Sequence, residues 1–353
     1  MLDDEKIYEE TDPGGMVTLL RDFPSQFPIG RQIAQDADIS SIDSGAVKNI
    51  VVCGMGGSAI GGDLVRSYAI DKLKIPMVIN RDYFLPAFVD KDSLVIGSSY
   101  SGNTEETLSC FEEAKNRGAL RIALTTGGKL AEIARADGLP LMILPPGLPP
   151  RAALGYSFAP ILTIIERLEL LPNQDTAFDE MLEKLQSGVK MFDTDRPSRE
   201  NDAKSLAFQL YDKLPLIYSD DRHFNTVAVR FRGQINENAK QLAYSAVIPE
   251  NNHNELVGWK HLGALPDSLI AVHISDDDMP ERVKFRMKFL EDVQLELEVE
   301  RTYIKSRGEG LLARMFSLIQ LGDWASYYLA ILNEEDPKPV KIIDKLKAAL
   351  AEI

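Results

Sequence analysis

Residues 98–104, which read SSYSGNT, hold the residue types best suited to binding a phosphate group. The segment follows an apolar run and opens a helical pattern, TEETLSCFEEAKNRG. The hydroxyls of Ser99, Ser101 and Thr104, a glycine and the free N–H groups of a helix start form a neutral site rich in hydrogen-bond donors. The Lys-Ser/Thr ending of a nucleotide P-loop is lacking, so ATP is not implied. The alternative role is a helix N-cap, with Asn103 or Ser101 as the capping residue.

A second glycine-rich turn, GMGGSAIGG at residues 54–62, also lies between an apolar run and a helical pattern. It satisfies the G-x-G-x-x-A form of a dinucleotide fingerprint, in which glycines let the backbone approach a phosphate. A nicotinamide site would also need an acidic residue about 20 positions on, and the nearest is Asp82 beside Arg81. Two such turns within 50 residues favour a sugar-phosphate site. A tight strand-to-helix turn without a ligand is the alternative.

These turns belong to a regular alternation of short apolar runs and amphipathic helical segments. Apolar runs at 48–53, 75–79, 93–98, 121–126 and 141–144 predict strands, and a second set begins at residues 214, 245, 268 and 296. Such alternation predicts an α/β fold with two doubly wound subdomains, each a parallel sheet covered by helices. We expect an N-terminal segment plus a first domain at 1–172, a linker at 172–176, and a second domain with a C-terminal helix at 173–353.

The composition excludes several classes of protein. The chain has 353 residues, with 39 Lys and Arg against 54 Asp and Glu, a net charge of −15. Such a surface repels nucleic-acid backbones and anionic lipids, so we expect no nucleic-acid or membrane partner. Two cysteines cannot form a disulfide scaffold or a four-cysteine metal site. The acidic start of the chain differs from a secretory signal, and we expect a cytoplasmic protein without a metal or cofactor.

Several motifs occur in a characteristic order: GMGGSAIGGDLVR, SYSGNTEET, TTGGKLAE, PPRAALG, NENAK, NNHNELVGW and IIDKLKAAL. In these motifs the chain resembles the bifunctional phosphoglucose/phosphomannose isomerases of the sugar isomerase (SIS) superfamily. The resemblance covers most of the chain from residue 50 onward. It implies two SIS-like domains and a sugar 6-phosphate substrate. The implied reaction is the reversible aldose–ketose isomerisation of glucose 6-phosphate and mannose 6-phosphate to fructose 6-phosphate through a cis-enediolate.

The resemblance also implies the residues that bind the substrate. Gly57 and Ser58 match the first substrate loop, and Ser99, Ser101 and Thr104 match the phosphate ligands.

Four further residues match the family's catalytic groups. Arg151, in PPRAALG, matches the arginine near the reacting carbons, where a guanidinium could stabilise an enediolate oxygen. Glu237 matches the base that moves a proton between adjacent carbons, and His253 matches the ring-opening histidine. Lys347 matches the C-terminal lysine that handles the anomeric hydroxyl, although Val340 stands where some members have a threonine. The alternatives are a surface ion pair for Arg151 and solvated helix positions for Glu237 and Lys347.

The two remaining histidines that we considered have other expected roles. His273 lies in an apolar run and is expected to be a satisfied core residue, and His261 is expected to lie in a loop.

Three rival functions stay open at this point. A non-catalytic SIS protein that binds a sugar phosphate and regulates a partner would have no reason to keep Arg151, Glu237 and His253 together. Glucosamine-phosphate synthesis is disfavoured because no glutaminase domain with an N-terminal cysteine precedes the first domain. A nicotinamide oxidoreductase depends on the Gly54 turn alone. The resemblance further implies a homodimer with shared active sites, in which His253 reaches the partner's site. The mixture of polar and apolar residues in NNHNELVGW suits an interface with Trp259 as its aromatic anchor. The alternative is that Trp259 covers the edge of its own domain.

Overall fold

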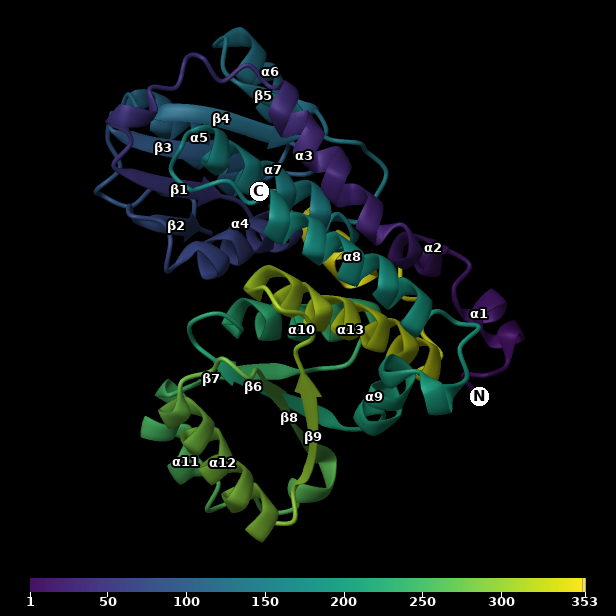
Figure 1. Cartoon of the computed structure of the whole chain (residues 1–353). Coiled ribbons are helices and arrows are strands. Elements are labelled where there is room, and N and C mark those ends of the chain that lie inside the picture. Colours follow the sequence, from purple (N-terminus) through teal and green to yellow (C-terminus); the bar gives the residue numbers. More distant parts are fainter. Residues whose placement is uncertain (351, 353) are drawn as a thin grey trace. The chain divides into compact units, whose positions relative to one another are not determined.

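The computed structural model describes residues 1–350 and residue 352. The strands of this part of the chain form two parallel sheets (Figure 1). The strands of the first sheet are β1 (Asn49–Cys53), β2 (Met77–Asn80), β3 (Ser93–Ser98), β4 (Leu120–Thr125) and β5 (Leu141–Ile143). The strands of the second sheet are β6 (Leu214–Asp220), β7 (Tyr244–Ile248), β8 (Leu269–Ser275) and β9 (Glu300–Lys305). The two doubly wound α/β sheets predicted from the sequence are therefore confirmed.

The first sheet has the strand order β2-β1-β3-β4-β5, with every pairing parallel. Its helices are α3 (Gln26–Asp36), α4 (Gly56–Ala69), α5 (Glu105–Asn116), α6 (Gly128–Ala136) and α7 (Leu154–Arg167), with short 3₁₀ turns η1 (Phe23–Ser25), η2 (Ser44–Ala46) and η3 (Pro150–Ala152). Helices cover both faces of the sheet. The consecutive strand residues Val51 and Val52, which point to opposite faces, are therefore both fully buried. Val51 packs with Cys110 and Ala114 of α5, whereas Val52 lies against Gly62 of α4.

The second sheet has the strand order β7-β6-β8-β9 and is also parallel throughout. Its unit contains α9 (Asp202–Leu210), α10 (Asn225–Asn238), α11 (Glu255–Gly258), α12 (Glu281–Glu296), α13 (Leu311–Leu332) and α14 (Lys341–Leu350), with the 3₁₀ turns η4 (Ser198–Glu200), η5 (Glu250–His253) and η6 (Pro266–Ser268). Helices α10 and α13 cover one face, and α11 and α12 cover the other (Figure 1).

The chain divides into two compact units that do not coincide with the predicted domain boundaries. The first unit is Asp22–Leu182, and the second joins Met1–Arg21 to the chain from Glu183 onward. The predicted boundary at residue 172 and linker at 172–176 differ from this division because α8 (Asp175–Phe192) begins in that segment and continues past Leu182.

The N-terminal segment belongs to the second unit because a buried lysine holds it there. The Lys204 ammonium, which is fully buried, donates to the carbonyl oxygens of Leu2 (2.8 Å), Thr194 (2.9 Å) and Arg196 (2.8 Å). The ring of Tyr8, in α1 (Glu5–Thr11), lies 6.2 Å from that of Tyr327. Helix α2 (Met16–Arg21) ends the segment. A lysine buried among carbonyl groups is costly unless each donor is satisfied, so this segment is fixed by a specific set of partners.

The strand predicted from residue 296 onward, in the sequence ELEVE, is wrong in position. Helix α12 continues to Glu296, Glu298 takes a positive φ of 58° in the turn that follows, and β9 starts at Glu300. The alternation of acidic and apolar residues imitates a strand. The spacing of the buried residues Met287, Leu290 and Gln294 is helical, and that spacing determines the structure.

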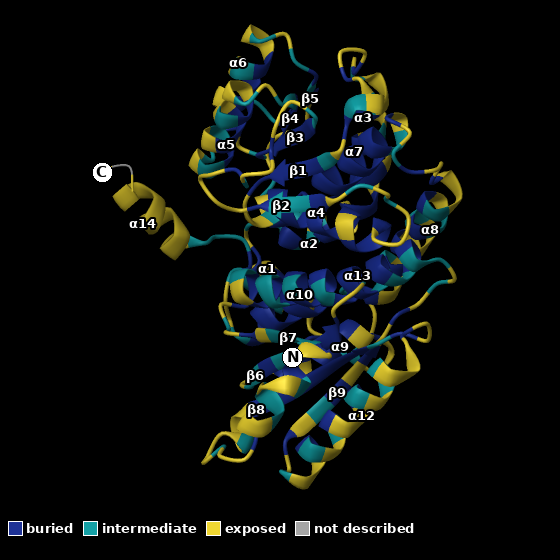
Figure 2. Ribbon diagram, turned by 90° about the vertical axis from the view of Figure 1, so that its left-hand side faces the viewer, coloured by how far each residue is buried: buried dark blue, intermediate teal, exposed yellow. Residues whose placement is uncertain are grey.

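Figure 2 shows that buried residues concentrate on the sheets and on the sheet-facing sides of the helices. Helix α14 is different, because each of its residues is exposed, Ile342 and Leu346 among them.

Within residues 1–350 and 352, no helix combines the length and apolar character needed to cross a membrane.

His273 is a core residue, as predicted, and His261 lies in a loop. The expectation that His273 is fully satisfied is wrong, because its buried Nδ1 has no hydrogen-bond partner in the described part of the chain. The His273 ring is fully buried, and its Nε2 lies 2.8 Å from Oε1 of Gln294. It stacks between the rings of Tyr218 (5.3 Å between centroids) and Tyr303 (5.6 Å). Burial lowers the pKa of His273 to about 4, which keeps the ring neutral at physiological pH.

We predict that His273 makes the folded state less stable as the pH falls from about 6.5 to about 4, since only the unfolded chain then binds its proton. The loss from this residue reaches up to about 3 kcal/mol. In urea unfolding at pH 7 and pH 4.5, His273→Gln should reduce the pH dependence of the unfolding free energy. The control His261→Gln, in an exposed loop, should leave it unchanged. Equal pH dependence in all three proteins would contradict the prediction.

Candidate active site

The polar loops of the first unit meet at one edge of its sheet. Strands β1, β3 and β4 are adjacent and parallel, so the loops that follow them all begin at the carboxyl edge. In open α/β sheets, ligands bind at this edge. The loops are the glycine-rich turn after Cys53, the segment Ser99–Thr104, and residues 126–128.

The Ser99–Thr104 loop is closed by its own hydroxyl groups. The hydroxyl of the buried Ser99 lies 2.9 Å from the hydroxyl of Thr104. The Gly102 N–H donates to the Ser99 hydroxyl over 3.1 Å. Ser101 is exposed, and its hydroxyl accepts from the Asn103 N–H (3.3 Å).

Thr104 is the N-cap of α5, but its side chain caps none of the first-turn N–H groups. The predicted alternative, capping by Asn103 or Ser101, is therefore not what the structure has. An N-terminus that its own N-cap side chain leaves uncapped can donate its N–H groups to an anion.

The third loop holds the second in place. The Thr126 N–H and hydroxyl both donate to the Tyr100 carbonyl oxygen, over 3.1 and 2.8 Å. The Leu130 N–H donates to the carbonyl oxygen of Gly102 (3.0 Å). Gly102 has φ +71°, and a Cβ atom there would lie 1.8 Å from the Gly127 carbonyl oxygen. Only glycine fits this contact, since a side chain would be both strained and in collision.

The first loop is tied to the second and lies close to η3. The Ser58 hydroxyl accepts from the Tyr100 N–H (3.0 Å), and the Ser98 hydroxyl donates to the Ser58 carbonyl oxygen (3.0 Å). A Cβ on Gly57 would lie 2.3 Å from the Pro150 carbonyl oxygen, so the start of α4 approaches η3 closely. The cavity that Gly57, Ser58 and Tyr100 help to line is only about 10 Å³, room for roughly one water molecule.

Arg151 lies in η3 beside this contact and is only 4% exposed. The alternative of a surface ion pair is therefore wrong. Burying a guanidinium group costs free energy, so a buried arginine needs specific partners or a functional role.

Tyr100 is a positioning residue that the sequence prediction missed. Its hydroxyl donates to the Pro145 carbonyl oxygen (2.6 Å) and accepts from the Leu148 N–H (3.3 Å). It thus connects the Ser99–Thr104 loop to the proline-rich segment that leads to Arg151. The sequence does mark this residue, because Tyr100 is the one large side chain in the otherwise small and polar motif SSYSGNT.

Glu237 lies in the last turn of α10 and is half-buried. Polar contacts to α13 fix that helix. Arg230 pairs with Asp323 (2.6 Å), Gln234 donates to Asp323 (2.9 Å), and Asn238 donates to Ser326 (2.9 Å). Contacts at every fourth residue set both the rotation and the axial position of α10, and thereby of Glu237.

His253 ends η5, is separated from α11 by Asn254, and is exposed. Lys347 lies on α14 and is also exposed. The nine predicted site residues thus divide between the two units. Six lie in the first unit, five of them in the loops described above and Arg151 in η3, and Glu237, His253 and Lys347 belong to the second.

The second sheet has no equivalent of the Ser99–Thr104 loop at the matching position. Strand β8 occupies the place in its sheet that β3 has in the first, and it is followed by Asp276, Asp277 and Asp278. Asp276 is buried and accepts from Arg314 Nε (2.8 Å). Three carboxylates repel a phosphate dianion, so this loop is not an anion site.

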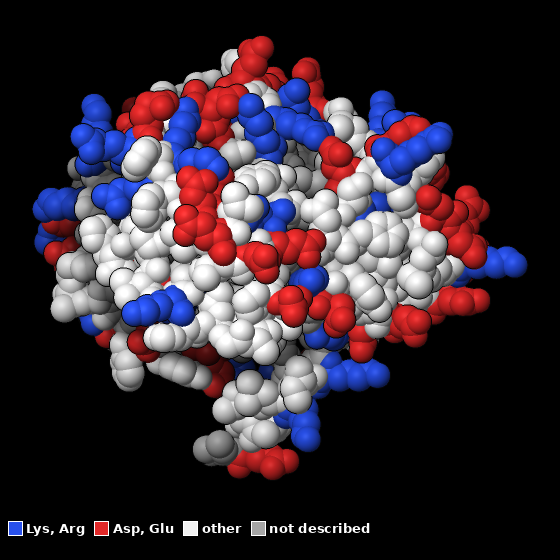
Figure 3. All heavy atoms as spheres, turned by 90° about the horizontal axis from the view of Figure 1, so that it is seen from below, with Lys and Arg blue, Asp and Glu red and all other residues white. Residues whose placement is uncertain are grey.

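Charged side chains give no sign of a basic surface on the face seen in Figure 3, where acidic and basic groups are interspersed. Among residues 1–350 and 352, no group of three or more His, Cys, Asp or Glu side chains is placed to hold a metal ion.

Fold and loops together define the SIS class of sugar-phosphate proteins, and comparisons with known proteins agree. A family described as the C-terminal SIS domain of bacterial phospho-glucose isomerase matches residues 199–350. A solved structure of a hypothetical protein from Thermus thermophilus superposes with a TM-score of 0.72, covering 98% of this chain and 92% of that one. Its sequence identity is 14%, so this similarity establishes the fold alone.

Curated relatives are more specific. A bifunctional phosphoglucose/phosphomannose isomerase from Caldicellulosiruptor bescii is 46% identical over 330 residues, covering 93% of this chain and 95% of the relative. The protein of the same description from Aquifex aeolicus is 36% identical, with coverage of 86% and 90%. The chain belongs to the family of bifunctional phosphoglucose/phosphomannose isomerases.

The contact between Gly102 and Gly127 generates a prediction with a matched control. Gly102→Ala should weaken the affinity for fructose 6-phosphate by at least roughly tenfold, because the loop must move away from the Gly127 carbonyl oxygen. Gly118→Ala carries the same positive-φ strain, at φ +72°, but its Cβ meets nothing nearer than 3.9 Å. Gly118→Ala should lose roughly 1–2 kcal/mol of stability from the positive φ alone, and Gly102→Ala should lose more because of the added collision. Calorimetric titration would contradict the prediction if the two variants bound the sugar phosphate equally well.

Proposed function

We propose that this protein catalyses the reversible isomerisation of glucose 6-phosphate and mannose 6-phosphate to fructose 6-phosphate through a cis-enediolate. The observation that carries the proposal is the Ser99–Thr104 loop, with the uncapped start of α5, in a chain of this family. In an acidic protein, neutral donors bind a phosphate dianion by local geometry. The two free, buried cysteines suit a reducing cytoplasm, where we place the activity.

One base can serve both aldoses. Glucose 6-phosphate and mannose 6-phosphate differ only in configuration at C2, and that carbon becomes planar in the enediolate. Removal of the C2 proton from either sugar therefore leads to one common intermediate. Return of a proton to C1 gives fructose 6-phosphate, and return to either face of C2 gives one or the other aldose.

The substrate-binding roles follow the loops of the first unit. Ser99, Ser101, Thr104 and the first-turn N–H groups of α5 bind the 6-phosphate. Gly57 and Ser58 lie along the sugar. Arg151 stabilises the negative oxygen of the enediolate, and its burial supports this role because electrostatic stabilisation is strongest where water is excluded.

Residues of the second unit supply the proton transfers. Glu237 carries the proton between C2 and C1, and the polar contacts that fix α10 support a role that needs a well-placed carboxylate. His253 donates a proton to the ring oxygen while Lys347 handles the anomeric hydroxyl, which opens the sugar ring.

We predict that Glu237→Gln lowers kcat by about 10²–10⁴-fold and leaves the Kd for fructose 6-phosphate nearly unchanged, because the amide keeps the shape but cannot accept a proton. The measurement is release of both aldoses from fructose 6-phosphate, with binding measured separately. Glu132→Gln, at an exposed position on α6, is the control and should behave as the unmodified protein. A Glu237→Gln enzyme that keeps more than roughly a tenth of the activity would show that another group is the base.

We further propose a homodimer in which His253 of one chain serves the active site of the other. The exposure of His253 and of Val257, which is 75% exposed, supports a surface available to a second copy. The expected role of Trp259 as the anchor of that interface is not supported. Its side chain is 4% exposed and packs within its own unit.

Mixing two inactive variants tests the shared site. Glu237→Gln and His253→Ala subunits, after exchange, should form mixed dimers in which one active site has both intact residues. Activity should return to about a quarter of the unmodified level, since half of the dimers are mixed and each has one working site. A mixture with proven subunit exchange and no recovered activity would contradict the shared site.

A further inference from the structure

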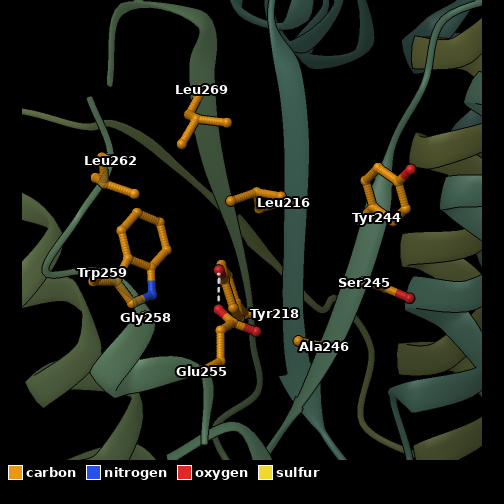
Figure 4. A pocket seen from close by; sticks show the side chains of 10 residues that line it. All are labelled: Leu216, Tyr218, Tyr244, Ser245, Ala246, Glu255, Gly258, Trp259, Leu262 and Leu269. Atoms are coloured by element: carbon orange, nitrogen blue, oxygen red, sulfur yellow. Dashed lines mark hydrogen bonds between the residues drawn. The ribbon is translucent and has the colours of Figure 1, made fainter. Parts of the chain in front are cut away.

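A cavity of about 350 Å³ lies on the second sheet, and none of the predicted site residues lines it. Its walls come from β6, β7, the first residue of β8 and the segment from Glu255 to Leu262 (Figure 4). Leu269 is the first residue of β8, and Tyr244, Ser245 and Ala246 are the first three of β7. The cavity therefore lies toward the amino ends of these two strands, whereas substrates of such sheets bind at the carboxyl edge. Its volume is within the range of small-molecule sites.

The lining is apolar with one carboxylate. Leu216, Leu262 and Leu269 supply aliphatic walls, and Tyr218, Tyr244 and Trp259 add aromatic rings. Among its lining residues Glu255 is the only charged one. A sugar phosphate would meet no cation there, so this is not a second phosphate site.

The Glu255 carboxylate has one hydrogen bond from a side chain in the described part of the protein. The Tyr218 hydroxyl donates to its Oε1 over 2.6 Å. Burial raises the pKa of Tyr218 well above its ordinary value, so the phenol keeps its proton and remains the donor. The carboxylate thus keeps acceptor capacity within apolar walls, where a cation is its most favourable partner.

Trp259 supplies the second polar group. Its ring is 4% exposed, and its Nε1–H has no hydrogen-bond partner among residues 1–350 and 352. In Figure 4 the indole nitrogen lies on the side of the ring toward Glu255 and Tyr218. A buried donor without a partner is destabilising, and an acceptor atom in the cavity would remove that cost.

We propose that this cavity binds a small organic ammonium compound that also carries a neutral hydrogen-bond acceptor. The ammonium group pairs with Glu255 and lies against the aromatic faces, which attract cations. The apolar body packs on Leu216 and Leu269, and the acceptor atom receives the Trp259 Nε1–H.

Three probes of one shape separate these contributions. Tyramine has the ammonium, the ring and a hydroxyl, 4-ethylphenol lacks the ammonium, and 2-phenylethylamine lacks the hydroxyl. The chain has two tryptophans, so ¹⁵N-labelled full-length protein shows two indole N–H signals, and Trp324→Phe identifies that of Trp259. Tyramine should shift the Trp259 signal saturably, 4-ethylphenol should bind roughly tenfold more weakly, and 2-phenylethylamine should bind with a smaller shift of that signal.

Variants test the carboxylate. Glu255→Gln should weaken tyramine by roughly tenfold and leave 4-ethylphenol unchanged, so the preference for the amine disappears. The control Glu281→Gln, which removes an exposed carboxylate on α12, should keep that preference. The probe series on the unmodified protein decides the question even if Glu255→Gln does not fold.

Three results would overturn the proposal. One is the absence of a saturable tyramine shift up to about 10 mM. Another is equal affinity for tyramine and 4-ethylphenol. The third is a Trp259 signal that moves with protein concentration alone, since a second copy of the chain would then fill the cavity.

Discussion

The close contact between Gly102 and Gly127 is the constraint on which the first unit's site depends. It brings the loop after β3 against the loop after β4, with backbone hydrogen bonds from Thr126 and Leu130 on either side. With the Tyr100 and Gly102 carbonyl groups occupied in this way, the Ser99 and Thr104 hydroxyls and the start of α5 remain at the sheet edge. A protein with a net charge of −15 gains no long-range attraction for a phosphate, so it must rely on such a rigid set of neutral donors.

The two units share an architecture and differ in chemistry. Each has a parallel sheet in which the second strand along the chain lies at an edge. At matching positions, however, the first sheet presents hydroxyls after β3, and the second presents carboxylates after β8. What the second unit offers instead is a helix, α10, fixed by the buried pair Arg230 and Asp323 and bearing Glu237 near its end. Such a division suits a reaction that needs an anion site and a base as separate parts.

The sequence predicted the sheets and the loops well because their signals are local. Apolar runs that end at glycine and serine turns marked the strands, and the positions of Ser99, Ser101 and Thr104 followed from them. It failed where long-range contacts decide. The segment ELEVE has the alternation of a strand. Its first residue nevertheless ends helix α12, in which Gln294 contacts His273 of β8. Residues 1–21 belong to the second unit because of their contacts with Lys204, which is distant in sequence. Trp259 is buried by the way its loop folds against the sheet, and no local pattern predicts that fold.

The central claim is that one enediolate connects both aldoses to fructose 6-phosphate, and isotope exchange tests it most directly. The unmodified protein is incubated with fructose 6-phosphate in D₂O, and the products are followed by NMR. A base that exchanges its proton with solvent should place deuterium at C2 of both glucose 6-phosphate and mannose 6-phosphate. Formation of a single aldose, or of both aldoses with no deuterium at C2 as the reaction reaches equilibrium, would contradict the account.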